Sequence, residues 1–113
     1  MATINSPFGA ADTTTIAIVA AGTGGTATIV NQLTIITTAV LTGNCALALT
    51  AGSELKAGAM IHLVAKTTAT ETITFSVDIV APVITGVAGK TVAQSFMYNG
   101  TKFYPCGAKI QVD

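Results

Sequence analysis

Residues 90–105 read KTVAQSFMYNGTKFYP, and this segment gives the strongest local indication of the fold that we expect. The Asn-Gly pair at 99–100 lies between two runs of aromatic and β-branched residues, and this pair favours the positive φ angles of a tight type I′ turn. We therefore predict a two-residue hairpin whose antiparallel partners count outward from the turn, so that Phe96 faces Phe103. Phe96, Tyr98 and Phe103 then share one face, which we predict to be the core side of the hairpin.

Short apolar segments separated by turn residues make up the rest of the chain. The clearest period-two pattern lies in residues 71–80, where Ile73, Phe75, Val77 and Ile79 are predicted to point inward. All such segments together give about eight strands at regular spacing, with almost no helical periodicity. The pattern predicts an all-β fold, namely an antiparallel β-sandwich or jelly roll of about eight strands.

The length and the charge balance limit the classes of function. The chain has 113 residues, which indicates one domain over residues 13–113 preceded by an N-terminal arm at residues 1–12. Half of the residues are apolar, only 9% are charged, and the formal net charge is zero. Such a chain has little charge repulsion between copies, which favours association over a monomeric state. The absence of Arg and of any Lys cluster argues against nucleic-acid binding. No apolar run is long enough for a membrane helix, so no membrane partner is expected.

Two segments are apolar on both faces, residues 45–50 and residues 59–65. A two-layer sandwich covers only one face of each strand, so these segments require a second burial partner. A symmetric homo-oligomer that shares apolar surface would supply that partner. We expect such an interface to be insensitive to salt, because it needs no charged anchor.

Residues with catalytic or ligating side chains form no recognisable motif. His62 is the sole histidine, and without a second histidine or a nearby carboxylate no metal site or Ser-His-Asp arrangement is expected. We interpret His62 as a hydrogen-bonded structural residue, with a titrating interface contact as the alternative. Cys45 and Cys106 lack metal-motif spacing and are expected to be reduced and buried, although a single bridge between them stays open.

Neither the glycine cluster nor the acidic residues indicate an enzyme. The cluster at 22–25 is followed by a strand, where a phosphate-binding loop would need a helix, so we predict a turn. The carboxylates show no spacing typical of an acid and base pair, and no serine lies in a nucleophile-elbow motif. We expect no enzyme activity, no catalytic residue, no metal and no cofactor.

A family resemblance rests on several short segments between residues 40 and 105. The segments are LTGNCALAL at 41–49, LKAGA at 55–59, TITF at 72–75, GKT at 89–91 and FMYNGTKF at 96–103. In this order they resemble the small β-rich domains of tailed-bacteriophage virion proteins, which include head fibres, capsid decoration proteins and tail-fibre modules. The chain departs from that pattern at residues 105–107, Pro-Cys-Gly, which leaves the role of residues 106–113 open.

The resemblance implies a non-catalytic structural subunit on a virion surface, commonly a homotrimer, with the major capsid protein or other virion proteins as partners. The first residues show neither the basic nor the apolar region of a secretory signal, so synthesis is expected to end in the host cytoplasm. The alternative is a carbohydrate- or receptor-binding jelly-roll module on a fibre. Tyr104, Gln94 and Lys102 are the candidate ligand contacts of such a module, because sugar sites combine an exposed aromatic ring with polar side chains.

Overall fold

The computed structural model describes residues 13–18 and 24–112, and every regular element in them is a β-strand. The predicted all-β, sandwich-like fold is confirmed for this part of the chain, which holds ten strands instead of the expected eight or so. The predicted arm at residues 1–12, and Gly22 and Thr23 of the predicted glycine turn, lie outside the described residues. The strands are β1 (Thr13–Ile18), β2 (Gly24–Ile29), β3 (Leu33–Thr38), β4 (Cys45–Ala51), β5 (Met60–Lys66), β6 (Thr72–Val77), β7 (Ile84–Thr85), β8 (Thr91–Tyr98), β9 (Phe103–Pro105) and β10 (Ile110–Val112).

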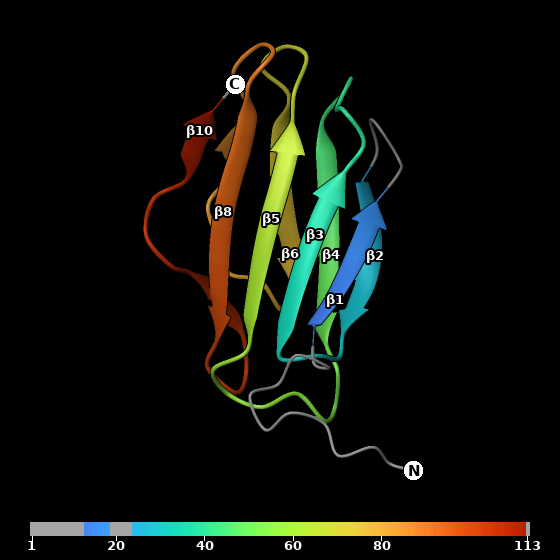
Figure 1. Ribbon diagram of the computed structural model, residues 1–113, viewed down its shortest axis with the longest axis vertical. Coiled ribbons are helices and arrows are strands. Elements are labelled where there is room, and N and C mark those ends of the chain that lie inside the picture. Colours follow the sequence, from blue (N-terminus) through green and yellow to red (C-terminus); the bar gives the residue numbers. More distant parts are fainter. Residues whose placement is uncertain (1–12, 19–23, 113) are drawn as a thin grey trace.

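The strands form two mixed sheets that lie one behind the other (Figure 1). Sheet A has the order β1-β3-β5-β8-β10, with β9 also paired to β8, and sheet B has the order β2-β4-β6-β7. From β1 to β6 the chain alternates between the sheets, so each strand of one layer is followed by a strand of the other. Figure 1 shows β1, β3, β5 and β8 side by side in one layer, with β2, β4 and β6 in the other.

This alternation makes the first six strands parallel within their sheets. β1, β3 and β5 pair in parallel in sheet A, and β2, β4 and β6 pair in parallel in sheet B. A parallel pair needs a crossover connection of about a dozen residues or more, and here the intervening strand of the opposite sheet provides that crossover. The predicted antiparallel sandwich is therefore wrong for β1 to β6. Alternation of apolar and polar residues is the same in both arrangements and cannot tell them apart.

The glycine pair at residues 24–25 belongs to β2 itself and not to a turn. Gly24 has a φ of +100°, and a Cβ atom built there would overlap the backbone oxygen of Ala46 on the neighbouring strand. Only glycine fits where β2 enters sheet B so close to β4.

The C-terminal part of the chain pairs antiparallel and completes both sheets. β8 lies antiparallel to β5, and both β9 and β10 pair antiparallel with β8. In sheet B the short β7 pairs antiparallel with β6. The predicted antiparallel pairing thus holds for the pairs that involve β7 to β10 and fails for the pairs among β1 to β6.

The core lies between the sheets and is built from every second residue of each long strand. Its largest fully buried aliphatic side chains include Ile36, Ile61 and Leu63 from sheet A, and Leu47, Leu49 and Ile73 from sheet B. Burial of each such side chain contributes about 1.5–3 kcal/mol relative to exposure. The predicted hairpin residues Phe96, Tyr98 and Phe103 are buried as well.

The hairpin between β8 and β9 has a longer loop than the sequence predicts. Tyr98 pairs with Phe103 and Phe96 pairs with Pro105, so the loop comprises residues 99–102. The Oδ1 atom of Asn99 accepts hydrogen bonds from the backbone N–H groups of Thr101 and Lys102, both at 2.9 Å, which stabilises this wider turn. The predicted pairing of Phe96 with Phe103 is wrong. Because the register moved by two residues, the same three aromatic side chains still share one face.

β6 ends at Val77, which has a φ of 68°. This left-handed conformation is rare for a β-branched residue and interrupts the alternation of the strand. The Val77 side chain is 53% exposed, so the prediction that it points inward is wrong. Ile73 and Ile79 on either side are buried, and Phe75 is partly buried against the core.

Candidate functional site: the outer face of sheet A

Sheet A has an outer face whose side chains alternate with the core residues. Ladder pairing aligns these outward residues in rows, such as Leu33, Met60 and Met97 in one row and Thr37, Val64 and Ala93 in another. We define the outer face of sheet A as the side chains of Thr15, Ala17, Leu33, Ile35, Thr37, Met60, His62, Val64, Lys66, Thr91, Ala93, Ser95, Met97, Tyr104, Ile110 and Val112.

Large apolar side chains dominate this outer face. Val64, Met97, Tyr104, Ile110 and Val112 are between 39% and 62% exposed, and Leu33, Ile35 and Met60 are partly exposed. Lys66, at one end of β5, is the only charged member of the set. Exposed large apolar side chains gathered on one face mark an interaction site more often than a surface that remains in water.

His62 and Ser95 lie near the centre of the outer face of sheet A. They are direct partners on β5 and β8, and the His62 Nδ1 atom lies 2.7 Å from the Ser95 Oγ atom. The predicted hydrogen-bonded histidine is confirmed, and Ser95 is its partner, which the sequence analysis did not identify. The face contains no carboxylate that could orient the imidazole ring, so the pair lacks the third member of a nucleophilic triad.

The outer face of sheet B has a different chemistry. We define it as the side chains of Thr26, Thr28, Ala46, Ala48, Thr50, Thr72, Thr74 and Ser76. These side chains are short, and most of them carry hydroxyl groups that water can satisfy. The outward residues of β4 are small, and Ala46 and Thr50 are exposed, whereas β5 presents the larger Met60 and Val64 on its outer side. Neither strand is packed on both sides within the described residues, so a second burial partner stays a prediction for both.

The structure does not bring the three candidate ligand contacts together. Tyr104 lies on the outer face of sheet A opposite Met97, whereas Gln94 on β8 faces the space between the sheets. Lys102 lies in the hairpin loop, where its Nζ atom donates a hydrogen bond to the Val77 carbonyl oxygen at 3.1 Å. Tyr104, Gln94 and Lys102, the candidate sugar contacts, thus lie on the outer face of sheet A, in the wall between the sheets and in the hairpin loop, respectively.

The hairpin loop is tied to the end of β6 through Asp78. Its Oδ1 atom lies 3.5 Å from Lys102 Nζ, and its Oδ2 atom accepts a hydrogen bond of 2.8 Å from the backbone N–H of Ala51. These contacts hold the kinked segment after Val77 against both β4 and the hairpin. They give Asp78 and Lys102 a structural role.

The two cysteines lie in different environments and are not bonded to each other. Cys45 is buried on the inner side of β4, and burial raises the pKa of its thiol above the ordinary value. Cys106 follows β9 and is exposed, so the prediction of burial is wrong for it. Burial thus makes the Cys45 thiol the less reactive one.

Comparisons with known proteins add no family to these observations. No protein-family model, no curated protein and no solved structure matches the chain. Within residues 13–18 and 24–112, no cluster of three or more His, Cys, Asp or Glu side chains could hold a metal ion. The same residues form no helix that is long and apolar enough to cross a lipid bilayer.

Proposed function

We propose that the chain is a non-catalytic structural subunit of a bacteriophage virion, a capsid decoration or head-fibre protein that assembles as a homotrimer. The observation that carries the proposal is the apolar, nearly uncharged outer face of sheet A. The virion context is supported by the resemblance of residues 41–103 to phage head-fibre, decoration and tail-fibre domains. In this proposal the subunit is made in the host cytoplasm and sits on the virion surface, where it contacts the major capsid protein or other virion proteins.

The size of the outer face of sheet A is suited to a subunit interface. Four adjacent strands of six to eight residues, β1, β3, β5 and β8, lie about 4.8 Å apart and cover roughly 20 Å by 20 Å, with the three-residue β10 at the edge. At about 25 cal/mol per Å², burial of a few hundred Å² of apolar area contributes several kcal/mol per subunit before the cost of association. That gain is sufficient to favour assembly at moderate protein concentration.

A second copy is the partner that this face fits best. The outer face of sheet A has one lysine, Lys66, at its margin and no acidic side chain. It therefore has no charge pattern that would attract a strongly charged partner. Its content of Met and Tyr, together with its lack of Glu and Asp, is typical of the core of a protein interface. Three copies that turn this face toward a threefold axis would bury the apolar rows against one another.

Light scattering coupled to size-exclusion chromatography tests the assembly. The expected mass is three times that of one chain, and it should not change between about 50 mM and 500 mM salt, because apolar burial is not screened. A monomer at every concentration would overturn the proposal. The virion context has a separate test, since an antibody against the chain should label intact phage particles from the source that encodes it.

A further inference from the structure

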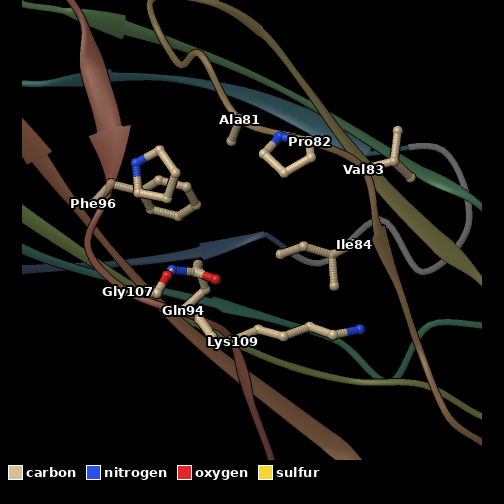
Figure 2. Close-up of a pocket in the computed structure, with 10 residues that line it drawn as sticks. Ala81, Pro82, Val83, Ile84, Gln94, Phe96, Gly107 and Lys109 are labelled. Atoms are coloured by element: carbon tan, nitrogen blue, oxygen red, sulfur yellow. Dashed lines mark hydrogen bonds between the residues drawn. The ribbon is translucent and has the colours of Figure 1, made fainter.

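A cavity of about 240 Å³ lies at one edge of the core, away from the outer face of sheet A. Figure 2 shows its lining, which comes from the segment between β6 and β7 with the start of β7, from β8, and from the end of β9 with the segment between β9 and β10. Pro82, Pro105 and Ala108 are exposed and form its rim, whereas Ile84 and Phe96 are buried and form its floor. Apolar groups therefore make up most of the wall.

Gln94 brings one polar group into this apolar wall. Its side chain is only 8% exposed, and its Nε2 atom donates hydrogen bonds of 3.1 Å to the carbonyl oxygens of Ser95 and Gly107. Carbonyl oxygens only accept, so these two bonds fix which end of the amide is nitrogen. The Oε1 atom is left on the other side, and Figure 2 shows it on the side of the amide that faces Ile84.

Residues 13–18 and 24–112 donate no hydrogen bond to the Oε1 atom of Gln94, and this atom is reached by solvent through the open side of the cavity. Water can therefore pair with Oε1, but the apolar walls give that water molecule few further partners, so the donor of a ligand can replace it. Lys109 lines the same cavity, but its Nζ atom donates a hydrogen bond of 2.8 Å to the Thr85 carbonyl oxygen. The cavity thus offers a ligand one oriented acceptor, Gln94 Oε1. The Lys109 ammonium group beside it is already hydrogen-bonded to the Thr85 carbonyl oxygen.

We propose that this cavity binds a compact, uncharged, apolar ring that carries one hydrogen-bond donor, and that the donor bonds to Gln94 Oε1. A cavity of about 150 Å³ with apolar walls accommodates benzene, so 240 Å³ has room for a ring system of the size of indole. Phenols and indoles combine such a ring with a single O–H or N–H group. The ring would pack on Phe96, Ile84 and the two proline rings, as small-molecule pockets with few polar groups do.

The first test compares indole with 1-methylindole, which has the same ring system without the N–H donor. In a titration followed by ¹⁵N NMR, indole should shift the amide signals of residues 81–84, 94–96 and 107–109 in a saturable way. 1-Methylindole should bind at least about tenfold more weakly, because it leaves Oε1 unpaired. Equal affinity for the two compounds, or no saturable binding of either, would overturn the proposal.

Two variants locate the binding. Gln94→Met keeps the length of the side chain and removes the acceptor, so it should abolish the preference for indole over 1-methylindole. Gln94→Met also deprives two carbonyl groups of a donor, so Ala108→Phe serves as a second variant that blocks the rim from an exposed position. Ala108→Phe should reduce indole binding at least about tenfold, and Ala69→Phe, at an exposed position in the loop before β6, should leave it unchanged. Undiminished binding to Ala108→Phe contradicts the proposal.

The ring could come from a free metabolite or from an aromatic side chain of a partner protein. Binding of N-acetyltryptophanamide distinguishes these two sources. This compound presents the indole ring on a peptide backbone. Binding comparable to that of indole indicates a partner's tryptophan, whereas exclusion of the amide with retention of indole indicates a free small molecule. The oligomeric state does not enter either readout, so failure of this proposal and failure of the trimer proposal can be told apart.

Discussion

The two outer faces of the molecule differ although the two inner faces are alike. Both sheets contribute Ile and Leu side chains to one core, and both have a central strand with regular alternation, β5 in sheet A and β4 in sheet B. On the outside, β5 presents Met60 and Val64 where β4 presents Ala46 and Thr50. The fold alone does not require this difference. This difference is what the proposed assembly explains: the outer face of sheet B is suited to contact with water, and the outer face of sheet A is the one that we propose another copy covers.

The contrast between the two outer faces requires that the inner and outer sides of each strand are assigned correctly. A substitution in β8 tests this assignment and should have the greatest effect on stability of the variants considered. Phe96 is fully buried between the sheets, and its ring packs edge-on against Phe75 with centroids 5.2 Å apart. Phe96→Ala should lower the free energy of unfolding by about 3–5 kcal/mol, since it removes a large core side chain. Ser76→Ala, on the exposed outer face of sheet B, is the control and should change it by less than about 0.5 kcal/mol. A loss below about 1 kcal/mol for Phe96→Ala would show that the faces are reversed.

A matched pair of lysine substitutions tests the outer faces directly. Val64→Lys places a charge at the centre of the outer face of sheet A, and Thr50→Lys places the same charge on the outer face of sheet B. Val64→Lys should weaken assembly by about 2 kcal/mol or more per subunit, because an unpaired charge is costly in an apolar interface. Analytical ultracentrifugation should then show dissociation for Val64→Lys and an unchanged oligomer for Thr50→Lys. Dissociation by both variants, or by neither, would contradict the assignment of the interface.

The alternation of side chains was readable from the sequence, and the direction of strand pairing was not. Ile61 and Leu63 between Met60 and Val64 already indicated a strand with two apolar faces. A parallel neighbour and an antiparallel neighbour both satisfy that pattern, so nothing local revealed that β5 pairs in parallel with β3. The pairing depends on which sheet receives each successive strand, and that is decided by packing over the whole domain.

The candidate sites show the same limit. His62 was predictable as a hydrogen-bonded residue but Ser95 as its partner was not, because the two are neighbours only through the register of β5 and β8. Gln94 was grouped with Tyr104 because both lie near the hairpin and combine a polar side chain with an aromatic ring, but proximity in sequence does not say which face each side chain takes. Tyr104 lies on β9, beyond the hairpin, and faces outward, whereas Gln94 faces inward.

Val77 marks the point where β6 leaves sheet B, and its backbone conformation is unusual. The other described residues with positive φ are all glycines, whereas Val77 is β-branched with a φ of 68°. Val77→Gly should raise the free energy of unfolding by about 0.5–1 kcal/mol, because the relief of left-handed strain exceeds the added entropy of the unfolded chain. Val80→Gly is the control, since Val80 is also exposed but has no positive φ, and it should lower stability. Chemical denaturation measures both; a loss for Val77→Gly would mean that its backbone is not strained.

Glu71 should have the smallest effect on stability. It directly precedes β6, where the chain enters sheet B from the preceding loop. Its Oε1 atom accepts a hydrogen bond of 2.8 Å from the backbone N–H of Ala69, and this bond, together with Thr68, holds the pKa of Glu71 below its ordinary value. A lowered folded-state pKa means that ionised Glu71 favours the folded state above the unfolded pKa of about 4.3. That contribution should disappear as the pH falls through the folded-state pKa, where both states take up the proton. Wild type should therefore be slightly more stable than Glu71→Gln at pH 7 and equal to it in strong acid. Glu54→Gln removes the same charge from an exposed loop and should cost less than Glu71→Gln at pH 7; equal losses would assign the effect to net charge and not to the turn that leads into sheet B.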